Sequence, residues 1–219
     1  MVQGQQKTGL EICALKIWCG ARRLVEMDHQ ISAGQITTVM GPSGAGKSTL
    51  LSALIGALAP EFCMQGRVIL HGCDVTDAPI ATRRIGILFQ DDLLFPHLSV
   101  GGNLAFGLPA CLRGRAVRQA RVAQALEQAG LAGFADRDPA TLSGGQRARV
   151  ALMRTLLAEP QALLLDEPFS RLDSDLRAQV RGFVFDQARA LGLPVMLVTH
   201  DAGDATAAQG PVLQLTSDA

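Results

Sequence analysis

The chain has 219 residues, of which 48% are hydrophobic and 18% charged, so it can bury a large core within one domain. Its 20 Lys and Arg balance its 20 Asp and Glu, which leaves no general attraction to nucleic acid or to an acidic lipid surface. The five cysteines show neither C-x-x-C pairing nor histidines at metal spacing, which predicts reduced core thiols in the cytoplasm.

No segment of the sequence predicts export or membrane insertion. The N-terminal residues Met1–Lys7 are polar and are not followed by the apolar stretch of a signal peptide. The most apolar helix-like segment, Leu50–Ala59, ends at Pro60, well short of the roughly 20 residues that cross a bilayer. We therefore expect any membrane role to come through a partner.

Short apolar runs alternate with helical patterns along the chain, which predicts an α/β fold around a covered parallel sheet. Two strands of a smaller antiparallel layer are expected over Leu10–Ile17 and Arg67–Leu70. The main sheet is expected to contain four strands: Ile36–Met40, Ile85–Phe89, Leu163–Asp166 and Val195–Thr199. From about Asp92 to Ala158 the strand signal vanishes, and helical patterns such as Val117–Ala129 predict a helical lobe.

The first chemical motif is the segment GPSGAGKS, which follows the predicted strand Ile36–Met40 and matches the phosphate-loop pattern G-x-x-x-x-G-K-[ST]. Its glycines allow backbone N–H groups to converge on phosphate oxygens, Lys47 adds a charge, and Ser48 offers a hydroxyl to Mg²⁺. An ordinary glycine-rich turn has no reason to place Lys and Ser at this point. We expect nucleotide phosphates to contact this segment: Gly41, Pro42, Ser43, Gly44, Ala45, Gly46, Lys47, Ser48 and Thr49.

A buried strand delivers two adjacent carboxylates, Asp166 and Glu167, to the edge of the predicted sheet. Successive side chains of a strand point in different directions, so one carboxylate can face a metal and the other a water. In-line phosphoryl transfer needs both charge neutralisation by metal and a positioned nucleophile. We assign Asp166 to the Mg²⁺ shell and Glu167 to polarising the attacking water. A solvated acidic turn is the alternative, and the upstream phosphate loop argues against it.

The third motif is Leu142-Ser143-Gly144-Gly145-Gln146, at which point the chain resembles the ABC ATPase family, whose signature this is. The segment also has a local explanation, because Ser143-x-x-Gln146 is a capping box that opens a helix over Arg147–Ala158. The two interpretations agree, since a helix start is an anion site. The resemblance implies that Ser143, Gly144, Gly145 and Gln146 bind the γ-phosphate held by a second copy of the chain.

The resemblance covers nearly the whole chain, with the family motifs in family order. It implies that Trp18 stacks on adenine, that Gln90 reaches Mg²⁺ and the attacking water, and that His200 contacts the γ-phosphate. A core or surface tryptophan is the alternative for Trp18. Asp91 and the segment Leu94–Val100 resemble the family surface that meets a transmembrane subunit, with packing inside the helical lobe as the alternative.

The family fold implied here is α/β, a P-loop NTPase core with a RecA-like, mostly parallel sheet, an N-terminal antiparallel β layer and an inserted helical lobe. We expect a single domain over residues 1–219, with residues 1–90 and 159–219 forming the nucleotide-binding core and residues 91–158 the helical lobe. The implied ligands are ATP and Mg²⁺. The implied partners are transmembrane permease subunits, a second copy in an ATP-sandwich dimer and a separate solute-binding protein, at the cytoplasmic face of the inner membrane. No nucleic acid is expected.

Two departures from the family pattern stand out. Arg171 replaces the small residue of the family's S-A-L-D loop, which leaves open whether this cation pairs across the dimer seam. After His200 the usual closing helix and strand are abbreviated. The function we expect is ATP hydrolysis that powers a bacterial solute importer. A soluble ABC ATPase acting on nucleic acid or ribosomes is the main alternative, and a small-molecule P-loop kinase would not explain Leu142–Gln146.

Overall fold

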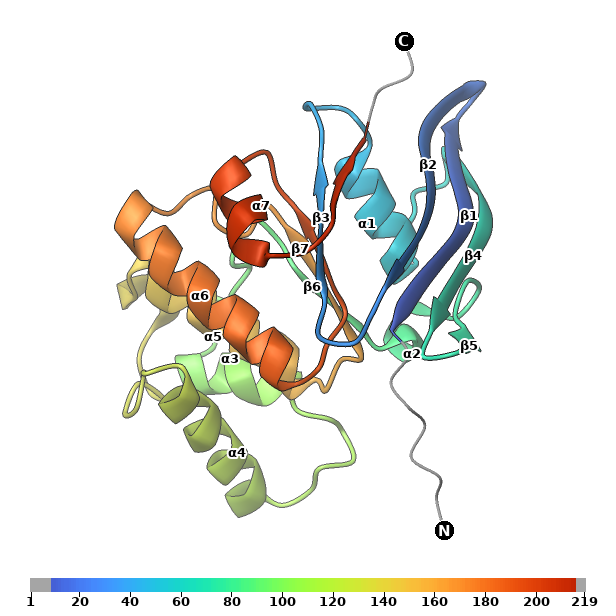
Figure 1. Ribbon diagram of the computed structural model, residues 1–219. Coiled ribbons are helices and arrows are strands. Elements are labelled where there is room, and N and C mark those ends of the chain that lie inside the picture. The colour runs from blue at the N-terminus through green and yellow to red at the C-terminus, as the bar shows by residue number, and fades with distance from the viewer. Residues whose placement is uncertain (1–8, 216–219) are drawn as a thin grey trace. The chain divides into compact units, whose positions relative to one another are not determined.

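An antiparallel sheet occupies the N-terminal part of the computed structural model, which describes residues 9–215 (Figure 1). The order is β2-β1-β4-β5, with the strands Leu10–Cys19 (β1), Arg22–Ile31 (β2), Phe62–Leu70 (β4) and Cys73–Asp74 (β5). A register shift between Ile12 and Leu15 bulges β1, so that Leu15 and Ile17 stay buried although an extra residue separates them from Ile12. The predicted antiparallel layer is confirmed, and β2 adds a strand that the sequence pattern did not indicate.

A second, mostly parallel sheet has the order β6-β7-β8-β3-β9. Its strands span Ile36–Met40 (β3), Ile85–Leu88 (β6), Ala162–Asp166 (β7), Val195–Val198 (β8) and Val212–Gln214 (β9). The pairs β7–β8, β8–β3 and β3–β9 run parallel. Every residue of β8 is buried, as expected for a strand covered on both faces. The four predicted strands are confirmed to within one residue at each end.

Helix α1 (Lys47–Ile55) lies between the two sheets (Figure 1). Its buried leucines Leu50, Leu51 and Leu54 share one hydrophobic core with residues of both sheets, such as Leu15 and Leu164. The sequence predicted a helix as far as Ala59, and this was wrong. The helix ends at Ile55 because the next residue is a glycine with φ 81°, which turns the chain into the left-handed conformation that closes a helix.

The C-terminal end of α1 is held by a buried arginine. Arg83, the last residue of α2 (Ile80–Arg83), is 5% exposed, and its guanidinium donates to the carbonyls of Ala53 and Leu54 at 3.0 and 2.9 Å. These are carbonyls that the last turn of a helix leaves without a partner. A Cβ on Gly56 would lie 2.6 Å from this guanidinium. The turn therefore requires glycine for space as well as for its positive φ.

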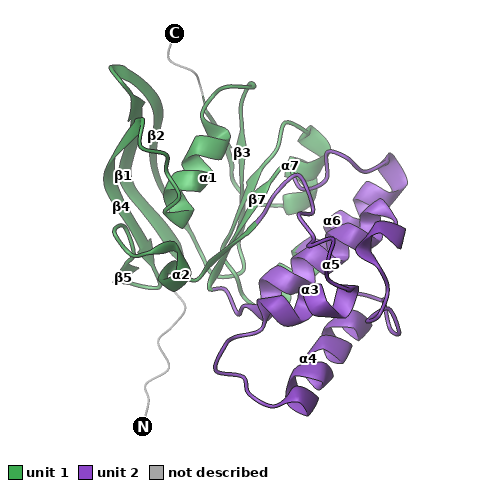
Figure 2. Ribbon diagram, turned by 180° about the vertical axis from the view of Figure 1, so that it is seen from behind, with its two compact units in different colours: residues 1–87, 161–167, 185–219 green, residues 88–160, 168–184 purple. Residues whose placement is uncertain are grey.

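The chain divides into two compact units, each described here by itself (Figure 2). Unit 1 comprises residues 1–87, 161–167 and 185–219 and contains both sheets. Unit 2 comprises residues 88–160 and 168–184. The expected helical lobe covered residues 91–158, whereas the second unit of the structure also takes in the segment 168–184. The assignment of separate roles to core and lobe stays a prediction.

Unit 2 is helical. Its elements are α3 (Val100–Gly107), α4 (Arg115–Gln128), a 3₁₀ turn (Pro139–Thr141), α5 (Gly144–Leu157) and most of α6 (Ser174–Ala190). The helix predicted over Val117–Ala129 is confirmed as α4. In unit 1 the abbreviated C-terminal helix is α7 (Ala202–Ala208). Within residues 9–215 no helix is both long and apolar enough to cross a membrane.

The prediction of core thiols was wrong. Cys19, Cys63, Cys73 and Cys111 are exposed, and Cys13 is half-buried. Four of the five lie in the antiparallel sheet, where side chains alternate between the two faces of a strand. The core face is filled by residues such as Val68 and Leu70, so the cysteines take outward or strand-end positions. All five are free thiols.

Candidate active site

The glycine-rich loop connects β3 to α1 and takes a shape that only glycine allows at several points. Gly44 and Gly46 have φ of 80° and 85°, in the left-handed region. A Cβ on Gly46 would approach Val25 Cγ2 to 2.8 Å, and one on Gly41 would approach the Leu215 carbonyl oxygen to 2.5 Å. Strands β2 and the C-terminal segment therefore press on the loop from outside and fix its path.

Lys47 lies across this loop instead of pointing into solvent. Its Nζ donates to the carbonyl oxygens of Gly41 and Pro42 at 2.8 and 2.9 Å, and the side chain is buried. Two neutral acceptors compensate an ammonium group only in part, so the charge remains available to phosphate oxygens. The loop and the lysine thus form an anion-binding cradle at the N-terminus of α1.

A hollow of about 330 Å³ opens over the cradle. Its lining contains six of the nine predicted phosphate-contacting residues, together with Glu167 and two apolar residues: Ser43, Gly44, Gly46, Lys47, Ser48, Thr49, Glu167, Leu24 and Phe62. Leu24 and Phe62 come from β2 and β4, and sequence analysis missed them. Trp18 lies on β1 opposite Arg23 and Cys63 and does not line this hollow, so its stacking on adenine stays a prediction.

Three of the nine residues predicted to contact phosphate do not line this hollow: Gly41, Pro42 and Ala45. Gly41 and Pro42 present carbonyl oxygens to Lys47, and Ala45 is buried in the core, where its N–H donates to the Pro42 carbonyl at 3.2 Å. These three shape the loop, and their direct contact with phosphate stays a prediction.

Asp166 ends β7 next to the start of α1. Its Oδ1 accepts a hydrogen bond from the Ser48 hydroxyl at 3.4 Å, which brings together the two oxygen donors predicted to hold Mg²⁺. Burial raises the pKa of Asp166 above its ordinary value and the nearby Glu167 carboxylate raises it further, while the Ser48 hydrogen bond and Lys47 lower it. Because burial makes the Asp166 carboxyl costly to ionise, a cation bound beside it would stabilise its charged form.

These donors fit Mg²⁺. This ion takes oxygen ligands and binds proteins through one or two side chains plus phosphates and water. Within residues 9–215 no group of three or more His, Cys, Asp and Glu side chains could hold a metal by itself. A serine hydroxyl and one carboxylate at the mouth of a phosphate cradle therefore suit a cation that arrives together with a nucleotide.

Glu167 and His200 lie together at the carboxyl ends of neighbouring strands. Glu167 follows β7, its N–H donates to the Val198 carbonyl at 2.9 Å, and its φ is 46°, an uncommon conformation for a residue other than glycine. Strain of this kind concentrates at functional sites. His200 follows β8, and its Nδ1 lies 3.1 Å from Glu167 Oε2. The structure thus brings these two predicted catalytic side chains into contact.

The other three histidines have structural roles. His29 Nε2 lies 3.2 Å from Thr37 Oγ1, and burial lowers the pKa of His29. His71 accepts the Gly9 N–H at Nδ1 and lies 3.2 Å from the Gln161 carbonyl at Nε2. His97 packs near the ring of Phe95. They fit the interpretation of satisfied core or surface residues.

The signature segment opens α5 in unit 2 with a complete capping box. The Ser143 hydroxyl accepts the Gln146 N–H at 3.3 Å, and the Gln146 side chain accepts the Ser143 N–H at 3.0 Å. The predicted capping box is therefore confirmed, although the helix begins at Gly144 and not at Arg147. No acidic residue lies in its first turn, so the start of α5 suits an anion.

Gly145 is buried inside unit 2. A Cβ at this position would lie 2.5 Å from Leu176 Cδ1, a side chain of α6. Its neighbour Gly144 is more open, because a Cβ there would meet only Leu172 Cδ2 at 3.4 Å and Arg147 at 3.8 Å. The need for glycine at position 145 thus has a cause within the chain itself, the close approach of α5 and α6.

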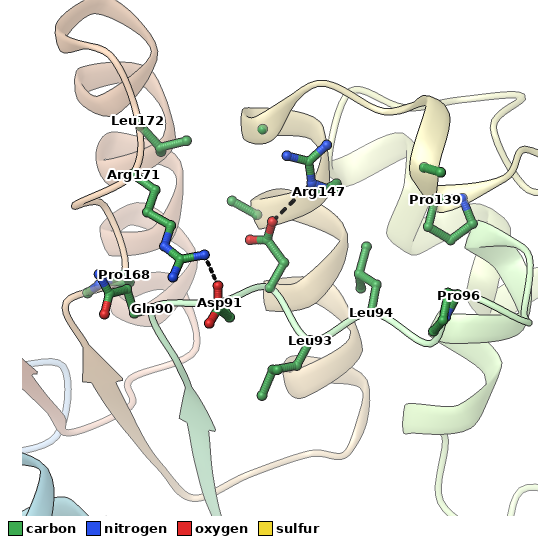
Figure 3. A pocket seen from close by; sticks show the side chains of 14 residues that line it. Gln90, Asp91, Leu93, Leu94, Pro96, Pro139, Arg147, Pro168, Arg171 and Leu172 are labelled. Carbon is green, nitrogen blue, oxygen red and sulfur yellow. Dashed lines mark hydrogen bonds and ion pairs between the residues drawn. The ribbon is translucent and has the colours of Figure 1, made fainter.

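A second hollow, of about 380 Å³, lies in unit 2 next to the segment that follows β6 (Figure 3). Two ion pairs cross it. Arg171 pairs with Asp91, and Arg147 Nε lies 3.3 Å from Asp92 Oδ2. Arg171, whose partner the sequence left open, is therefore paired inside its own chain with the residue that follows Gln90. Gln90 itself lines this hollow, and its reach to Mg²⁺ and water stays a prediction.

The segment that follows Asp92 combines buried anchors with exposed apolar side chains. Buried Asn103 accepts the Phe95 N–H at 2.8 Å and donates to the Phe95 carbonyl at 3.1 Å, and Ser99 caps α3. Leu93 and Phe106 are nevertheless mostly exposed, and the Phe106 ring packs edge-on against Phe95 at 4.7 Å. An exposed apolar surface on a rigid base is typical of a contact surface for another protein.

A glycine cradle, a paired serine and aspartate, and a glutamate beside a histidine at the edge of a parallel sheet define a P-loop nucleoside triphosphatase. Residues 24–170 match the protein family described as ABC transporter, and this chain belongs to that family. It is an ATP-binding protein that hydrolyses ATP.

Three relatives illustrate the similarity. The uncharacterized ABC transporter ATP-binding protein YnjD of Escherichia coli K12 is 56% identical over 85% of this chain and 86% of its own length. The thiamine import ATP-binding protein ThiQ of Cereibacter sphaeroides is 46% identical over 81% of this chain and 76% of its own length. The Fe(3+) ions import ATP-binding protein FbpC 1 of Haemophilus influenzae is 42% identical over 85% of this chain, which spans only 56% of that protein.

The fold is shared with a solved ABC transporter. A chain from that transporter, in an inward-facing conformation, superposes with a TM-score of 0.77 at 26% identity, covering 95% of this chain and 80% of its own. The predicted fold class, an α/β P-loop NTPase with an antiparallel layer, is confirmed.

Proposed function

We propose that this chain is the ATP-hydrolysing subunit of a bacterial solute importer and works as a dimer of two copies bound to separate membrane permease subunits. The observation that carries the proposal is the coexistence, in one chain, of a phosphate cradle with paired Ser48–Asp166 and Glu167–His200 in unit 1 and of a capped helix start without acidic residues in unit 2. A small-molecule P-loop kinase would need only the first. Import is supported by relatives whose names are those of thiamine, Fe(3+) and sulfate import proteins.

Hydrolysis follows from the arrangement in unit 1. Lys47 and the loop N–H groups bind the phosphates, and Ser48 and Asp166 would hold Mg²⁺, which neutralises charge on the transferred phosphoryl group. Glu167 accepts a hydrogen bond from the attacking water and takes its proton as the bond to phosphorus forms. In this proposal His200, in contact with Glu167 Oε2, orients that carboxylate and donates a hydrogen bond to a phosphate oxygen. The role of Gln90 at Mg²⁺ and the attacking water, which the family resemblance implies, belongs to the same proposal.

The membrane partner is proposed to contact unit 2. Exposed Leu93 and Phe106, with Asp91 and the anchored segment Leu94–Val100, offer the apolar surface on which a permease segment would dock. The subunit would then lie at the cytoplasmic face of the inner membrane and serve a solute-binding protein on the other side. Cargo would be selected by those partners, as the family resemblance implies.

A charge at the signature helix tests whether each site is completed by a second copy. Asp and Asn cap helices about as well as Ser, so Ser143→Asp and Ser143→Asn both keep α5 intact. Only Asp adds a negative charge, which at about 4 Å from a phosphate oxygen costs roughly 4 kcal/mol at an effective dielectric near 20. We expect Ser143→Asp to bind ATP normally and to lose hydrolysis, and Ser143→Asn to keep both. Gly145→Asp is less informative because its side chain would collide with Leu176.

Mixing variants sharpens this test. In a mixed dimer of Ser143→Asp with Lys47→Ala, one composite site carries both defects and the other carries neither. Hydrolysis by the mixture should therefore exceed the sum of the two separate variants. An activity equal to that sum would show that each chain completes its own site, and the proposal of a dimer with composite sites would be withdrawn.

The permease partner is tested by capture from membranes. Tagged protein expressed in its native host should co-purify with an integral membrane protein from detergent extracts, and Phe106→Asp should abolish this while the exposed substitution Val117→Asp should not. Recovery of ribosomal or nucleic-acid-binding proteins instead would favour the soluble ABC ATPase alternative.

A further inference from the structure

A buried carboxylate in unit 1 takes no part in the hydrolysis described above. Asp204, on α7, is 1% exposed, and so is Thr199, which directly follows β8. The Thr199 hydroxyl donates to Asp204 Oδ2 at 3.1 Å. A buried charge is costly unless hydrogen bonds compensate it, so the position of Asp204 requires a structural or functional reason.

The same hydroxyl fixes the backbone on the far side of His200. Thr199 Oγ1 accepts the Asp201 N–H at 3.1 Å while it donates to Asp204. One hydroxyl therefore links the residues on either side of His200 and joins them to the buried carboxylate. The Thr199 N–H donates to the Val39 carbonyl at 3.2 Å, which ties this residue to the sheet. The His200 side chain is mostly exposed and contacts Glu167. The backbone around it must therefore carry much of the ordering of its imidazole.

Asp201 completes the arrangement. Its carboxylate accepts the N–H groups of Gly203 and Asp204 at 2.7 and 3.1 Å and so caps α7. The peptide between His200 and Asp201 is thus held by Thr199 on one side and by the start of α7 on the other. This backbone limits the positions that the His200 imidazole can take, and its Nδ1 lies 3.1 Å from Glu167 Oε2.

We propose that Thr199 and Asp204 are positioning residues for hydrolysis: Asp204 orients the Thr199 hydroxyl, and this hydroxyl holds the His200 backbone so that the imidazole stays against Glu167. The inference rests on the proposed function, in which Glu167 and His200 act on the attacking water. Both side chains are buried, and neither lines the hollow over the phosphate cradle. Their effect is expected on turnover and not on binding.

The first test compares three variants with the same matched control. Thr199→Val removes the hydroxyl at nearly constant volume, and we expect kcat to fall about tenfold while KM for ATP changes less than about twofold. Thr199→Ser restores the hydroxyl and should recover most of the rate. Asp204→Asn keeps an acceptor for the hydroxyl but not its charge and should fall between them. The control is Thr206→Val, which removes a hydroxyl of the same helix that bonds only the Ala202 carbonyl, and should be neutral.

A second test asks whether the effect passes through His200. In a His200→Ala background Thr199→Val should cost little further turnover, because residues that act through one another are not additive. Equal losses in both backgrounds would overturn the proposal, as would a raised KM with unchanged kcat or a failure of Thr199→Ser to recover. A wild-type protein that binds ATP without hydrolysing it would instead count against the proposed function.

A third test needs no turnover. The chain has only four histidines, so His200→Ala identifies the His200 imidazole signals in an NMR spectrum of histidine-labelled protein. We expect Thr199→Val and Asp204→Asn to shift these signals, and Thr199→Ser and Thr206→Val to leave them near their wild-type positions. Unmoved His200 signals in Thr199→Val, with the protein folded, would refute the positioning role even if turnover fell.

Discussion

The two units hold their functional groups in different ways. In unit 1 the main chain holds the glycine-rich loop in place: Gly44 and Gly46 adopt positive φ, and Lys47 donates to loop carbonyls. In unit 2 the segment after Gln90 is held by side-chain ion pairs, those of Asp91 and Asp92 with arginines (Figure 3). A site built from backbone is little affected by salt or surface charge, whereas exposed ion pairs respond to both. The cradle in unit 1 should therefore respond less to salt and surface charge than the segment of unit 2 that is proposed to contact a partner.

The largest effect is expected where the backbone presents a single irreplaceable side chain. Glu167→Gln keeps the size of the group but cannot take a proton from water, so turnover should fall by at least roughly a hundredfold while ATP affinity is retained. ATPase kinetics and equilibrium nucleotide binding measure the two effects. Glu61→Gln, on an exposed residue of the same unit, serves as the control. Undiminished hydrolysis by Glu167→Gln would remove this residue from the mechanism.

Lys47→Ala should affect binding as well as rate. It removes a charge-assisted contact to phosphate together with the two hydrogen bonds that hold the loop, and we expect ATP affinity to fall roughly tenfold to a hundredfold. Calorimetric or fluorescent titration with ATP measures this. Lys16→Ala, which breaks a surface ion pair with Glu26, should leave affinity unchanged. Normal binding by Lys47→Ala would mean that the cradle has been misinterpreted.

A smaller effect is expected in unit 2 from the Arg171–Asp91 pair, whose side chains are 62% and 52% exposed. A double-mutant cycle of Arg171→Ala and Asp91→Ala should give a coupling of at most about 1 kcal/mol in the free energy of unfolding. The coupling should shrink further in about 1 M salt. A coupling that persists undiminished at high salt would contradict the contrast between the two units.

The smallest effect is a pH dependence at Asp92. Burial raises the pKa of this carboxyl, although Arg147 lowers it again in part. A group with a raised pKa in the folded state contributes stability at low pH that is lost as pH rises through that pKa. Asn does not titrate, so wild type should lose stability relative to Asp92→Asn as pH rises from about 4 to about 7. Urea denaturation across this range measures the trend, and the opposite slope would show that Arg147 dominates.

Much of unit 1 could be predicted because its chemistry is local in sequence. The strand Ile36–Met40 and the loop that follows it are adjacent, and the continuous apolar runs of β7 and β8 match fully buried strands. The capping box at Ser143 is likewise a pattern of four neighbouring residues. The strands that precede Glu167 and His200 were predicted at one sheet edge, but the contact between these two side chains was not itself predicted.

What the sequence did not reveal depends on distant packing. Leu24 and Phe62 line the hollow over the glycine-rich loop only because the antiparallel sheet brings them there, and no motif near them in the sequence indicates it. Gly145 faces Leu176, a contact set by the packing of two helices. For α6 a signal existed and was overlooked: Val180, Val184 and Ala188 are buried at the spacing of a helix face.

Arg83, whose guanidinium binds the last carbonyls of α1, affects the order in which the protein can fold during synthesis. A ribosome releases the nucleotide loop and α1 before Arg83, so the carbonyls of Ala53 and Leu54 wait for a side chain that has not yet been synthesised. A nine-residue helix has little stability of its own in water. The nascent chain therefore gains a finished phosphate cradle only after the β4–β5 hairpin has emerged and turned Arg83 back onto the helix. A fragment that stops short of this residue would carry the complete motif and lack the structure that makes it a binding site.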